Sequence, residues 1–463
     1  MTTLAQNDNQ PARLFIYTTV FVASIGGFLF GFDLVVIAGA LPYVEKDFQL
    51  GAALKGFAVS SANLGALVGP LLGLWFTERL GRKKTMMLSA FCFAVSTVGT
   101  SLAGNVWSFA LWRFMGGLGI GLAMMSSPIY IAELSPPKLR GVLVNINQLS
   151  NVIGINLAVL AGYVFSSEDW GWRWMFAAQA VPVILLLAGL FIIPESPRWL
   201  ATQNRLNEAL SILTRINGRD KAQAELEEIR REVGEETGGF RELFARGIRK
   251  ALVIGIVIMV FSQINGVNMM LLYAPTILSE AGIQISSTAI LSSMPIYILI
   301  LITTCLAFPL IRKFSRRGLL IASVLFMAIG HIIMAINLSQ HWTPAYTLIP
   351  MLIGTGAFTL GLAPLSWVIV SEIFPNRVRG IAMAVVCVFL YASSFITSQF
   401  FPMLTDWFTA RFNSPAGVYW IFAAICCACA AFTWAMVPET KGLSLENISD
   451  FWKKRSHNEH ANA

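Results

Sequence analysis

Long apolar runs without charge alternate with short polar segments along the whole chain. The uncharged runs cover residues 14–32 and 34–44, 56–77, 85–112, 114–132, 141–167, 174–194, 251–279, 281–311, 318–371, 380–405 and 412–438. A helix needs about 20 apolar residues to cross the hydrocarbon of a bilayer. The run 318–371 is long enough for two helices, with Pro350 between them. The pattern therefore predicts an all-α membrane protein with twelve transmembrane helices.

Three polar motifs occur twice, in the same order. The pairs are 79–83 with 313–317, 132–141 with 371–380, and 194–196 with 438–440. Their separations are 234, 239 and 244 residues. Such regularity indicates the duplication of a six-helix half. Because six is even, both halves start on the same side of the membrane, which makes them parallel repeats.

A polar segment lies between the two predicted halves. It is rich in Glu, Arg and Lys and is too polar to cross a bilayer. The spacing of Leu206, Leu210 and Leu213 in this segment predicts short amphipathic helices. We therefore divide the chain into an N-terminal half (1–200), a cytoplasmic linker (201–250), a C-terminal half (251–437) and a cytoplasmic tail (438–463).

Positive charge is concentrated in short loops that alternate along the chain. These loops carry Arg79, Arg82, Lys83 and Lys84; Lys138 and Arg140; Arg312, Lys313, Arg316 and Arg317; Arg377 and Arg379; and Lys453, Lys454 and Arg455. The positive-inside rule places these loops and both termini in the cytoplasm. The net charge of +8 is therefore interpreted as a topology signal and not as nucleic-acid binding. We expect a multi-pass protein of the inner (plasma) membrane.

The composition excludes several classes of protein. Hydrophobic residues make up 56% of the chain, charged residues only 13%, and the mean hydropathy is +0.66. The six cysteines lie in apolar runs without metal-ligand spacing, which favours packing over a metal site or disulfides. The sequence has no nucleotide-binding loop and no nucleophile–base pair. We therefore expect no enzyme, no cofactor and no ATP-driven pump.

Two ionisable residues lie inside predicted spans. Asp33 stands about nine residues before Pro42, where we expect its helix to end, and Arg113 about eight residues after Asn105, where the fourth helix begins. At 1.5 Å per residue both lie about 12–14 Å deep, so they can face each other. Ionisable groups inside a membrane are expensive and usually functional, so we interpret the pair as a proton switch. The alternative is a permanent structural ion pair.

Two clusters of amide side chains lie in otherwise apolar spans. In the fifth span, Gln148 and Asn151 lie within about a 100° arc of the helix. In the seventh span, Gln263 and Asn268 flank Gly266, which is expected to loosen the helix. Amides offer both donors and acceptors, which suits hydroxyl-rich ligands. The alternative role for such amides is hydrogen bonding between helices.

The tenth predicted span contains Pro364 and Trp367. We expect the proline to break the helix and to form a flexible gate. The indole of Trp367 could stack on the apolar face of a sugar ring, whereas packing or anchoring is the more common role of tryptophan in membrane proteins.

The repeated motifs place acidic and basic residues at predicted cytoplasmic helix ends. We expect Glu133 and Glu372 to bind the basic loops in one state and to release them in another, which would form a reversible latch. The alternative is that these charges only set the topology. The predicted cytoplasmic gate consists of Glu78, Arg82, Glu133, Arg140, Glu195, Arg316, Glu372, Arg379 and Glu439.

A set of motifs spread along the chain is shared with one family. The motifs are RLGRK at 79–83, RFMGGLGIG at 113–121, AEL at 132–134 with RG at 140–141, PESPRWL at 194–200, QINGVN at 263–268, SEIFP at 371–375 with RG at 379–380, and PETKG at 438–442. On these residues the chain resembles the sugar porter family of the major facilitator superfamily over nearly its whole length. The resemblance implies the major facilitator fold and alternating access by rocking of the two halves.

The resemblance also implies roles for individual residues. The positions that bind or line the sugar pocket in the family match Phe30, Gln148, Gln263, Asn268 and Trp367. In proton-coupled members, an aspartate and an arginine match Asp33 and Arg113. Asn151 stands where the family commonly has an aliphatic residue, and we include it among the predicted substrate-binding residues.

Several positions depart from the family pattern. Ser262 replaces the first of two common glutamines in span seven, and Leu390 and Tyr391 stand at the usual polar and indole positions of span eleven. Glu78 replaces the usual Asn or Asp before the first basic motif. The C-terminal half of the pocket is therefore less polar than in glucose or xylose carriers, which admits a deoxy sugar, a polyol or a less polar compound.

We expect a monomeric secondary transporter that carries a monosaccharide or related polyol together with protons across the lipid bilayer. The first alternative is a facilitative uniporter in which the Asp33–Arg113 pair is purely structural. A non-transporting nutrient sensor would need a longer tail than the roughly 25 residues after Pro438, and a drug exporter would have a less amide-rich pocket. Dependence of uptake on the proton gradient separates symport from uniport.

Overall fold

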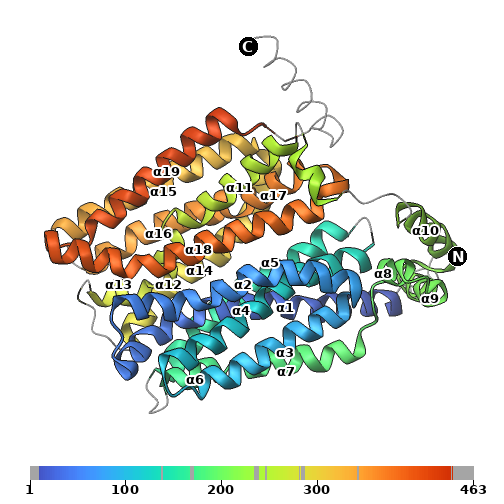
Figure 1. The fold of residues 1–463 in the computed structure, drawn as a ribbon, viewed down its shortest axis with the longest axis horizontal. Coiled ribbons are helices and arrows are strands. Elements are labelled where there is room, and N and C mark those ends of the chain that lie inside the picture. Colours follow the sequence, from blue (N-terminus) through green and yellow to red (C-terminus); the bar gives the residue numbers. More distant parts are fainter. Residues whose placement is uncertain are drawn as a thin grey trace, which may run out of the picture.

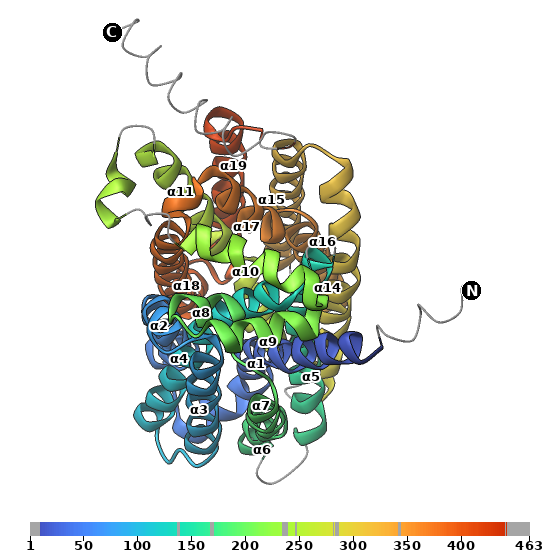
Figure 2. The same cartoon turned by 90° about the vertical axis from the view of Figure 1, so that its right-hand side faces the viewer.

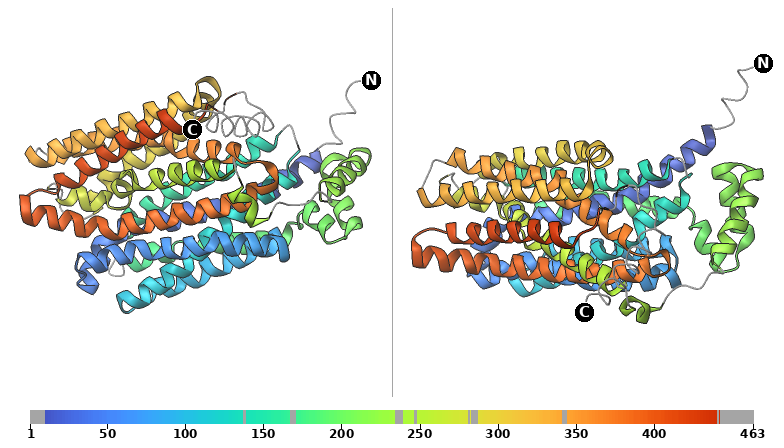
Figure 3. Two further views of the ribbon diagram at one scale, coloured as in Figure 1. Left: turned by 45° about the horizontal axis from the view of Figure 1, so that its top comes forward. Right: turned by 90° about the horizontal axis from the view of Figure 1, so that it is seen from above.

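A computed structural model describes residues 10–136, 139–166, 171–233, 239–245, 248–280, 282, 287–340, 344–439 and 441. Every regular element among these residues is a helix. In Figure 1 the helices of the N-terminal half form the lower layer and those of the C-terminal half the upper layer, with most helices roughly parallel to the long axis. The two further views in Figure 3 show the same elongated bundle.

The N-terminal half follows the predicted runs closely. Its helices are α1 (Gln10–Phe48), α2 (Ala52–Arg79), α3 (Arg82–Ser101), α4 (Val106–Leu134), α5 (Arg140–Phe165), α6 (Gly171–Ala177) and α7 (Ala180–Ile192). The last two form one span with a break at Ala178 and Gln179.

The C-terminal half contains two further broken spans. Its helices are α11 (Ile248–Ile264), α12 (Val267–Leu272), α13 (Ala274–Glu280), α14 (Ser287–Lys313), α15 (Arg316–Gln340), α16 (Pro344–Leu360), α17 (Leu362–Ile373), α18 (Asn376–Phe412) and α19 (Ala416–Met436). The seventh span is broken between α11 and α12, and the tenth between α16 and α17.

Short helices connect the halves and lie across one end of the bundle, as Figure 2 shows. They are α8 (Pro197–Thr202), α9 (Leu206–Asn217), α10 (Arg219–Val233) and the 3-10 helix η1 (Phe240–Phe244). The apolar face of α9 is buried, as its amphipathic spacing predicted. Arg215 of α9 lies over the ring of Phe15 in α1, 4.2 Å from its centroid. The helix α9 is thus docked on the N-terminal half, whereas η1 contacts α11 and α18 of the C-terminal half.

Eleven spans of the described chain are long and apolar enough to cross a membrane. The helix α3 is the remaining predicted span, with 20 residues and more polar side chains. Several of its hydroxyl groups are bonded, within the helix from Thr97 Oγ1 to Phe93 O at 2.8 Å and from Ser101 Oγ to Thr97 O at 2.7 Å, and to α4 from Ser89 Oγ to Gly119 O at 2.7 Å. Satisfied hydroxyl groups are tolerated in membrane helices, so α3 packs with the apolar spans. The prediction of an all-α membrane protein is confirmed.

Two prolines do not end helices as predicted. Pro42 lies inside α1, which continues to Phe48, and Pro350 lies inside α16. The boundary within the run 318–371 lies instead between Gln340 and Pro344. Neighbouring helices and local adjustments satisfy the backbone group that a proline frees, so an interior proline is tolerated in a packed membrane bundle. Asp33 is therefore deeper, about 22 Å from the end of α1 at 1.5 Å per residue.

Some predicted features lie outside the described residues. They include Lys138 and most of the tail 438–463, of which only 438, 439 and 441 are described. The division of the chain into four segments remains a prediction.

Glycines bring helices of the N-terminal half into backbone contact. A methyl group on Gly117 of α4 would lie 1.9 Å from Ala62 O of α2, and one on Gly154 of α5 would lie 2.1 Å from Phe28 O of α1. Small residues permit this close approach, which supplies much of the packing between helices in a bilayer. The pairs α2–α4 and α1–α5 are thereby held rigidly.

The two ends of the bundle differ in how the halves meet. We name the end that carries Arg82 and Arg316 the basic end and the opposite one the distal end. In the distal part of the bundle, Ser60 Oγ donates to Gln399 Oε1 at 2.9 Å, and Asn63 Nδ2 donates to Ser398 Oγ at 2.9 Å. Gln399 Nε2 also donates to Ala53 O at 2.9 Å. These bonds join α2 to α18 and close the distal end.

Candidate functional site

Asp33 and Arg113 form an ion pair inside the N-terminal half. Arg113 Nη1 lies 2.9 Å from Asp33 Oδ2, and each side chain is 1% exposed. The same nitrogen donates to Asp33 O at 3.0 Å. The structure thus brings together the two predicted ionisable residues, from α1 and α4. A fully buried pair is costly to maintain unless it is well paired, so its retention favours a functional role.

Polar and aromatic groups from two other helices surround this ion pair. Ser96 of α3 and the Asp33 carboxylate both lie against Gly116, where a methyl group would meet them at 2.6 and 3.2 Å. Arg113 Cζ lies 5.5 Å from the ring centroid of Phe176 in α6. The side chain of Gln179 reaches Asp33 from the break between α6 and α7. The pair therefore sits where four elements of the N-terminal half meet.

Gln179 is a site residue that the sequence analysis missed. It is 1% exposed, and neither of its amide atoms meets the full geometry of a hydrogen bond within the described structure. The sequence does contain an indication of this role, because Gln179 is the lone amide in the uncharged run 174–194. A single buried polar group in an apolar run is informative, because such a group needs a partner or a function.

Gln148 has an exposed side chain, although it lies well inside α5. The bilayer-facing residues of α5 are Ile153, Leu157 and Leu160, which are 39%, 42% and 40% exposed. Gln148 lies about 120–180° around the helix from them at 100° per residue. Its exposed amide therefore points away from the exposed apolar residues of α5, and its role in substrate binding stays a prediction.

Asn151, in contrast, is engaged in helix packing. It is 7% exposed, and its Nδ2 donates to Gly27 O of α1 at 3.3 Å. A methyl group on Gly31 would lie 2.0 Å from Asn151 O. This is the inter-helix role that the sequence left open as the alternative for one of the amides. Asn151 supports the α1–α5 contact beside Gln148.

The break between α11 and α12 brings Gln263 and Asn268 together. Gly266 adopts φ 86°, a left-handed conformation that suits glycine, so the predicted loosening of the helix is confirmed. Asn268 Nδ2 donates to Gln263 Oε1 at 2.8 Å across the break. Asn265 Oδ1 accepts from Val267 N at 2.9 Å and caps the new helix. The two predicted amides thus form one half-buried pair.

The tenth span breaks at Gly361, three residues earlier than predicted. Gly361 has φ −131° and ψ −79°, whereas Pro364 lies in the first turn of α17. A proline is tolerated there because the first N–H groups of a helix have no partner within the helix. Trp367 and Phe30 are both half-buried and pack against the same apolar core. One aromatic side chain from each half thus lies at the edge of the core, and the place of both beside a substrate stays a prediction.

The C-terminal wall of the predicted substrate site is poor in free polar groups. Leu390 and Tyr391 are 6% and 5% exposed, and the Tyr391 hydroxyl contacts the sulfur of Met124 at 3.1 Å. The Tyr297 hydroxyl donates to Leu271 O at 2.7 Å. Asn156 of α5 donates to Tyr297 O at 3.0 Å and joins the halves. The hydroxyls of this wall are thus already bonded.

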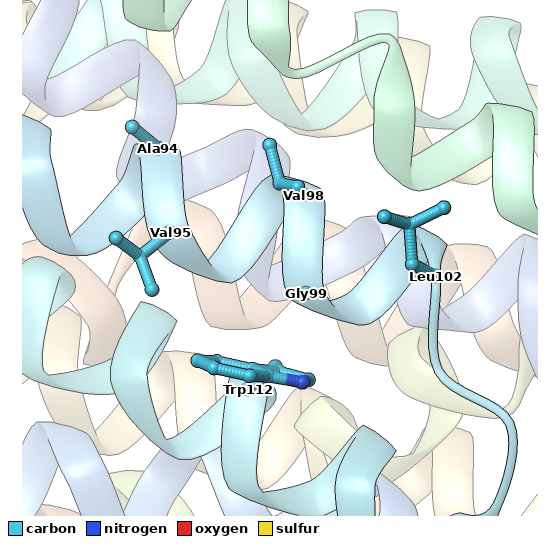
Figure 4. Close-up of a pocket in the computed structure, with 6 residues that line it drawn as sticks. All are labelled: Ala94, Val95, Val98, Gly99, Leu102 and Trp112. Atoms are coloured by element: carbon cyan, nitrogen blue, oxygen red, sulfur yellow. The ribbon is translucent and has the colours of Figure 1, made fainter.

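A cavity between α3 and α4 is unsuited to a hydroxyl-rich ligand. Figure 4 shows that it is lined by Trp112 and by small or aliphatic residues of α3. Its volume is about 500 Å³. Val98 and Leu102 at its rim are 59% and 68% exposed, as expected of a bilayer-facing surface. This cavity lies apart from the amides.

At the basic end of the N-terminal half, repeated motif residues form a cluster. Arg82 binds Glu133 with two bonds, from Nε at 2.9 Å and from Nη2 at 2.8 Å. Ser196 Oγ donates to Glu133 Oε2 at 2.5 Å. Glu195 accepts from the backbone N–H of Lys83 at 3.0 Å and of Ser196 at 2.8 Å. We call Arg82, Glu133, Glu195 and Ser196 the N-cluster.

The C-terminal half repeats this arrangement. Arg316 binds Glu372, and the Ser315 hydroxyl donates to Glu439. Glu439 also accepts from the backbone N–H of Arg316 and of Arg317, each at 3.2 Å. We call Arg316, Glu372, Glu439 and Ser315 the C-cluster. The three sequence pairs thus occupy equivalent positions in the two halves.

Three predicted gate residues lie outside both clusters. Glu78 has an exposed side chain, and its carbonyl accepts from Trp199 Nε1 at 2.8 Å. Arg140 is exposed at the start of α5. Arg379 Nη2 donates to Phe374 O at 3.2 Å. A role for these three residues as gate residues stays a prediction.

The two repeated glutamates at the basic end have opposite pKa shifts. Burial raises the pKa of Glu195, although backbone N–H groups and Arg82 lower it in part. Burial also raises the pKa of Glu439, but the bonds from Ser315 and from three backbone N–H groups outweigh it, so the net pKa is lowered.

No group of three or more His, Cys, Asp or Glu residues that could hold a metal occurs in the described part of the chain.

Comparison with known proteins gives consistent matches over most of the chain. Residues 19–452 match the family described as "Sugar (and other) transporter". The arabinose-proton symporter of Bacillus subtilis is 36% identical over 444 residues, which cover 93% of this chain and 94% of that protein. The D-xylose-proton symporter of Escherichia coli is 34% identical over 476 residues, which cover 95% of this chain and 96% of that protein.

Solved structures agree with the fold. The inward-open xylose transporter XylE from E. coli has a TM-score of 0.83 at 33% identity, covering 95% of this chain and 100% of that chain. The proton:xylose symporter XylE bound to 6-bromo-6-deoxy-D-glucose has a TM-score of 0.80 at 34% identity, covering 95% of this chain and 99% of that chain. The predicted major facilitator fold is confirmed.

Proposed function

Because the chain belongs to the sugar porter family of the major facilitator superfamily, whose members are transporters and not enzymes, we propose that it is a proton-coupled symporter of a monosaccharide or related polyol. It lies in the inner membrane with both termini in the cytoplasm and works as a monomer. The N-terminal half (1–200) and the C-terminal half (251–437) rock about the substrate, which gives alternating access.

The observation that carries the proton-coupled part of this proposal is the ion pair of Asp33 and Arg113. The pair is fully buried between two membrane-spanning helices. Two apolar side chains would be less costly there, so we interpret the retained charges as groups that take up and release a proton. Protonation of Asp33 removes the attraction that holds Arg113. The guanidinium is then released to other acceptors, and α1 and α4 shift relative to each other. A proton can in this way alter the helix that carries Phe30.

The proposed substrate site lies between the two amide groups. Gln148 offers an exposed amide from α5, and Gln263 and Asn268 offer a second pair from the break in the seventh span. Each amide donates and accepts, which matches sugar hydroxyls. Trp367 and Phe30 border the apolar faces of the ring. We exclude Asn151 from direct contact, because its amide bonds the backbone of α1.

The pentoses are the first candidates for the substrate. Two of the relatives are an arabinose-proton and a D-xylose-proton symporter. The hydroxyl groups of Tyr297 and Tyr391 are already bonded, which favours a substrate with few hydroxyl groups facing the C-terminal half. A galactose-proton symporter is a further relative at 32% identity, so hexoses belong in the same comparison.

The structure supports a state that is closed on the outside. The hydrogen bonds from Gln399 and Ser398 join the halves at the distal end, which the positive-inside rule makes external. At the basic end, the Arg82–Glu133 and Arg316–Glu372 pairs each lie within one half. In the outward-open state we expect Glu133 and Glu372 to accept from Arg379 and Arg140 of the opposite half. This exchange of partners is the latch.

The deciding experiment is a pH measurement in a lightly buffered suspension of proteoliposomes. Arabinose, xylose, hexoses, deoxy sugars and polyols are added one at a time. External alkalinisation with one compound, abolished by a protonophore, is expected and would identify both substrate and coupling. If no compound alters the pH while the vesicles still exchange a radiolabelled sugar, the protein is a facilitative uniporter and the ion pair is structural.

A further inference from the structure

The imidazole of His331 is a buried polar group that the proposed mechanism does not use. His331 lies in α15 and is 0% exposed. Neither ring nitrogen meets the full geometry of a hydrogen bond to another described residue. Buried polar groups in folded proteins are nearly always bonded, so an exception calls for a physical account. The residues packed around the ring provide one.

His331 lies behind the break in the seventh span. Its ring centroid is 5.5 Å from that of Phe422 and 6.2 Å from that of Tyr419, both in α19. Phe422 also covers the break itself, since a methyl group on Gly266 would lie 2.3 Å from the Phe422 ring. One aromatic side chain therefore touches both the imidazole and the left-handed glycine. A shift of the imidazole or of Gly266 therefore displaces the Phe422 ring and, through it, the other group, because packed side chains leave no free space.

The break frees a backbone carbonyl that needs a donor. In a continuous helix, the N–H of Met269 would donate to Asn265 O, but here it donates to Gly266 O at 3.1 Å. Asn265 O accepts from Cys426 Sγ at 3.8 Å, and a thiol is a weak donor. The backbone of Asn265 also lies against the His331 ring. Asn265 is 1% exposed, so bulk water does not supply the bond.

We propose that His331 donates a ring N–H to the carbonyl oxygen of Asn265 and thereby holds the break that orients Gln263 and Asn268. His331 is then a positioning residue for substrate binding, located behind the site and out of contact with the substrate. The substrate part of this inference rests on the proposed function. The structural part, support of the break, does not.

The test compares variants of His331 in the full chain, reconstituted in lipid nanodiscs. His331→Leu removes the donor, whereas His331→Gln and His331→Asn keep an amide N–H near the positions of Nε2 and Nδ1. Met334→Leu is the matched control, because Met334 is also 0% exposed in α15 and its side chain has no N–H group. Backbone hydrogen exchange is measured over residues 261–272, together with the KM and the maximal rate of sugar exchange.

We expect His331→Leu to speed exchange over 261–272 about threefold to tenfold and to raise KM by a similar factor, with the maximal rate within about twofold of wild type. At least one of the two amide variants should restore both values, and Met334→Leu should leave both unchanged. A structural defect alone would lower the maximal rate and leave KM as it is, because fewer molecules would be folded.

Unchanged hydrogen exchange in His331→Leu would overturn the inference, as would amide variants that are both as impaired as His331→Leu. If His331→Leu does not fold, His331→Met replaces it as the variant without a donor. Since the exchange measurement needs no sugar and no proton gradient, it decides the support of the break even if transport is not proton-coupled. A failed pH assay with altered exchange would refute only the proposed function.

Discussion

The N-cluster and the C-cluster occupy equivalent positions, but they differ in their surroundings. Arg82 and Glu133 are 14% and 10% exposed, whereas Arg316 and Glu372 are 20% and 27% exposed. The N-cluster is covered by α8, whose Trp199 packs against Gly81 and bonds the carbonyl of Glu78. The same polar motif is therefore more deeply buried in one half than in the other.

The difference extends through the whole bundle. The N-terminal half contains a fully buried ion pair and close backbone contacts between helices. The C-terminal half contains two broken spans, at Gly266 and Gly361, whereas the N-terminal half contains one, between α6 and α7. We infer that the two halves share one scaffold, which carries a buried ion pair in the N-terminal half and an additional break in the C-terminal half. Substitutions in the N-terminal half then test the role of the buried charge, and substitutions in the C-terminal half test the role of the breaks.

The largest expected effect is the loss of coupling in Asp33→Asn. Concentrative uptake of sugar should fall to an accumulation ratio of about one, while exchange of labelled sugar continues. The change leaves Arg113 buried without its counter-charge, which costs about 3–5 kcal/mol, so reduced thermal stability is also expected. Uptake against a gradient and exchange without one are measured in the same vesicles.

The matched control for this change lies in the other half. His331→Gln removes a titratable group of the C-terminal half at a buried site, and accumulation should persist in it. Accumulation that survives in Asp33→Asn would exclude Asp33 as the coupling site. Loss of accumulation in both variants would break the division of charge and flexibility between the halves.

The second prediction compares amides across the substrate site. Gln148→Ala should raise KM about tenfold to a hundredfold, equivalent to roughly 1–3 kcal/mol for hydroxyl groups left unpaired. Gln263→Ala should have at least as large an effect, because it also removes the acceptor of the Asn268 amide. Initial rates of exchange at varied sugar concentration give both values.

Ile153→Ala is the control on α5, since Ile153 faces the bilayer and should leave KM unchanged. If Gln148→Ala and Ile153→Ala have equal KM values, Gln148 is not in the site. If only Gln263→Ala raises KM, the substrate binds to the C-terminal half alone.

The third prediction returns to the two clusters. Glu133→Gln should lower the free energy of unfolding by about 1–2 kcal/mol, since it weakens two charged bonds from Arg82 at a largely buried site. Glu372→Gln should lower it by about 1 kcal/mol or less, because its pair is more exposed. Thermal unfolding midpoints in one detergent compare the two variants.

Glu208→Gln serves as the exposed reference, because its pair with Arg205 is about half exposed. Its midpoint should match that of wild type. Equal losses in Glu133→Gln and Glu372→Gln would mean that the burial of α8 over the N-cluster has no energetic effect.

The sequence was sufficient for features that depend on residue type and spacing. The spans follow from the charge-free runs, and the binding of Glu133 and Glu372 to basic loops follows from motif order. The structure identifies the partners as Arg82 and Arg316. Gly266 also broke the seventh span as expected, because glycine alone takes a positive φ without strain. These predictions needed no knowledge of how helices pack.

Other features depend on contacts that spacing does not specify. Asn151 and Gln148 look alike on α5, but only Asn151 meets the backbone of α1, which Gly27 and Gly31 allow to approach. Pro42 and Pro350 looked like helix ends, yet neighbouring helices accommodate them. Gln179 is the lone amide of its apolar run and His331 is one of several polar residues in the run 318–371, and the groups around both come from other helices. Their roles required the fold.

The smallest expected effect is also the sharpest comparison between the halves, because the two repeated glutamates should respond to pH with opposite sign. The pKa of Glu195 is raised by burial, so its ionised form is unfavourable in the folded state. Glu195→Gln should therefore be slightly more stable than wild type at pH 7. This advantage should fade as the pH drops from the raised pKa toward the ordinary value of 4.5, since wild type then takes up the proton.

Glu439 should behave in the opposite way. Its pKa is lowered by hydrogen bonds that outweigh burial, so the ionised form stabilises the fold. Glu439→Gln should be less stable than wild type at pH 7, and the difference should vanish as the pH falls from 4.5 through the lowered pKa. Shifts of roughly 1–3 °C in the unfolding midpoint are expected for both variants, because the sites are near the surface. Midpoints measured from pH 3.5 to pH 8, with Glu78→Gln as the exposed control, would separate the two cases. Differences of the same sign would show that the two clusters are electrostatically equivalent, and the asymmetry of the halves would then begin only at the buried ion pair.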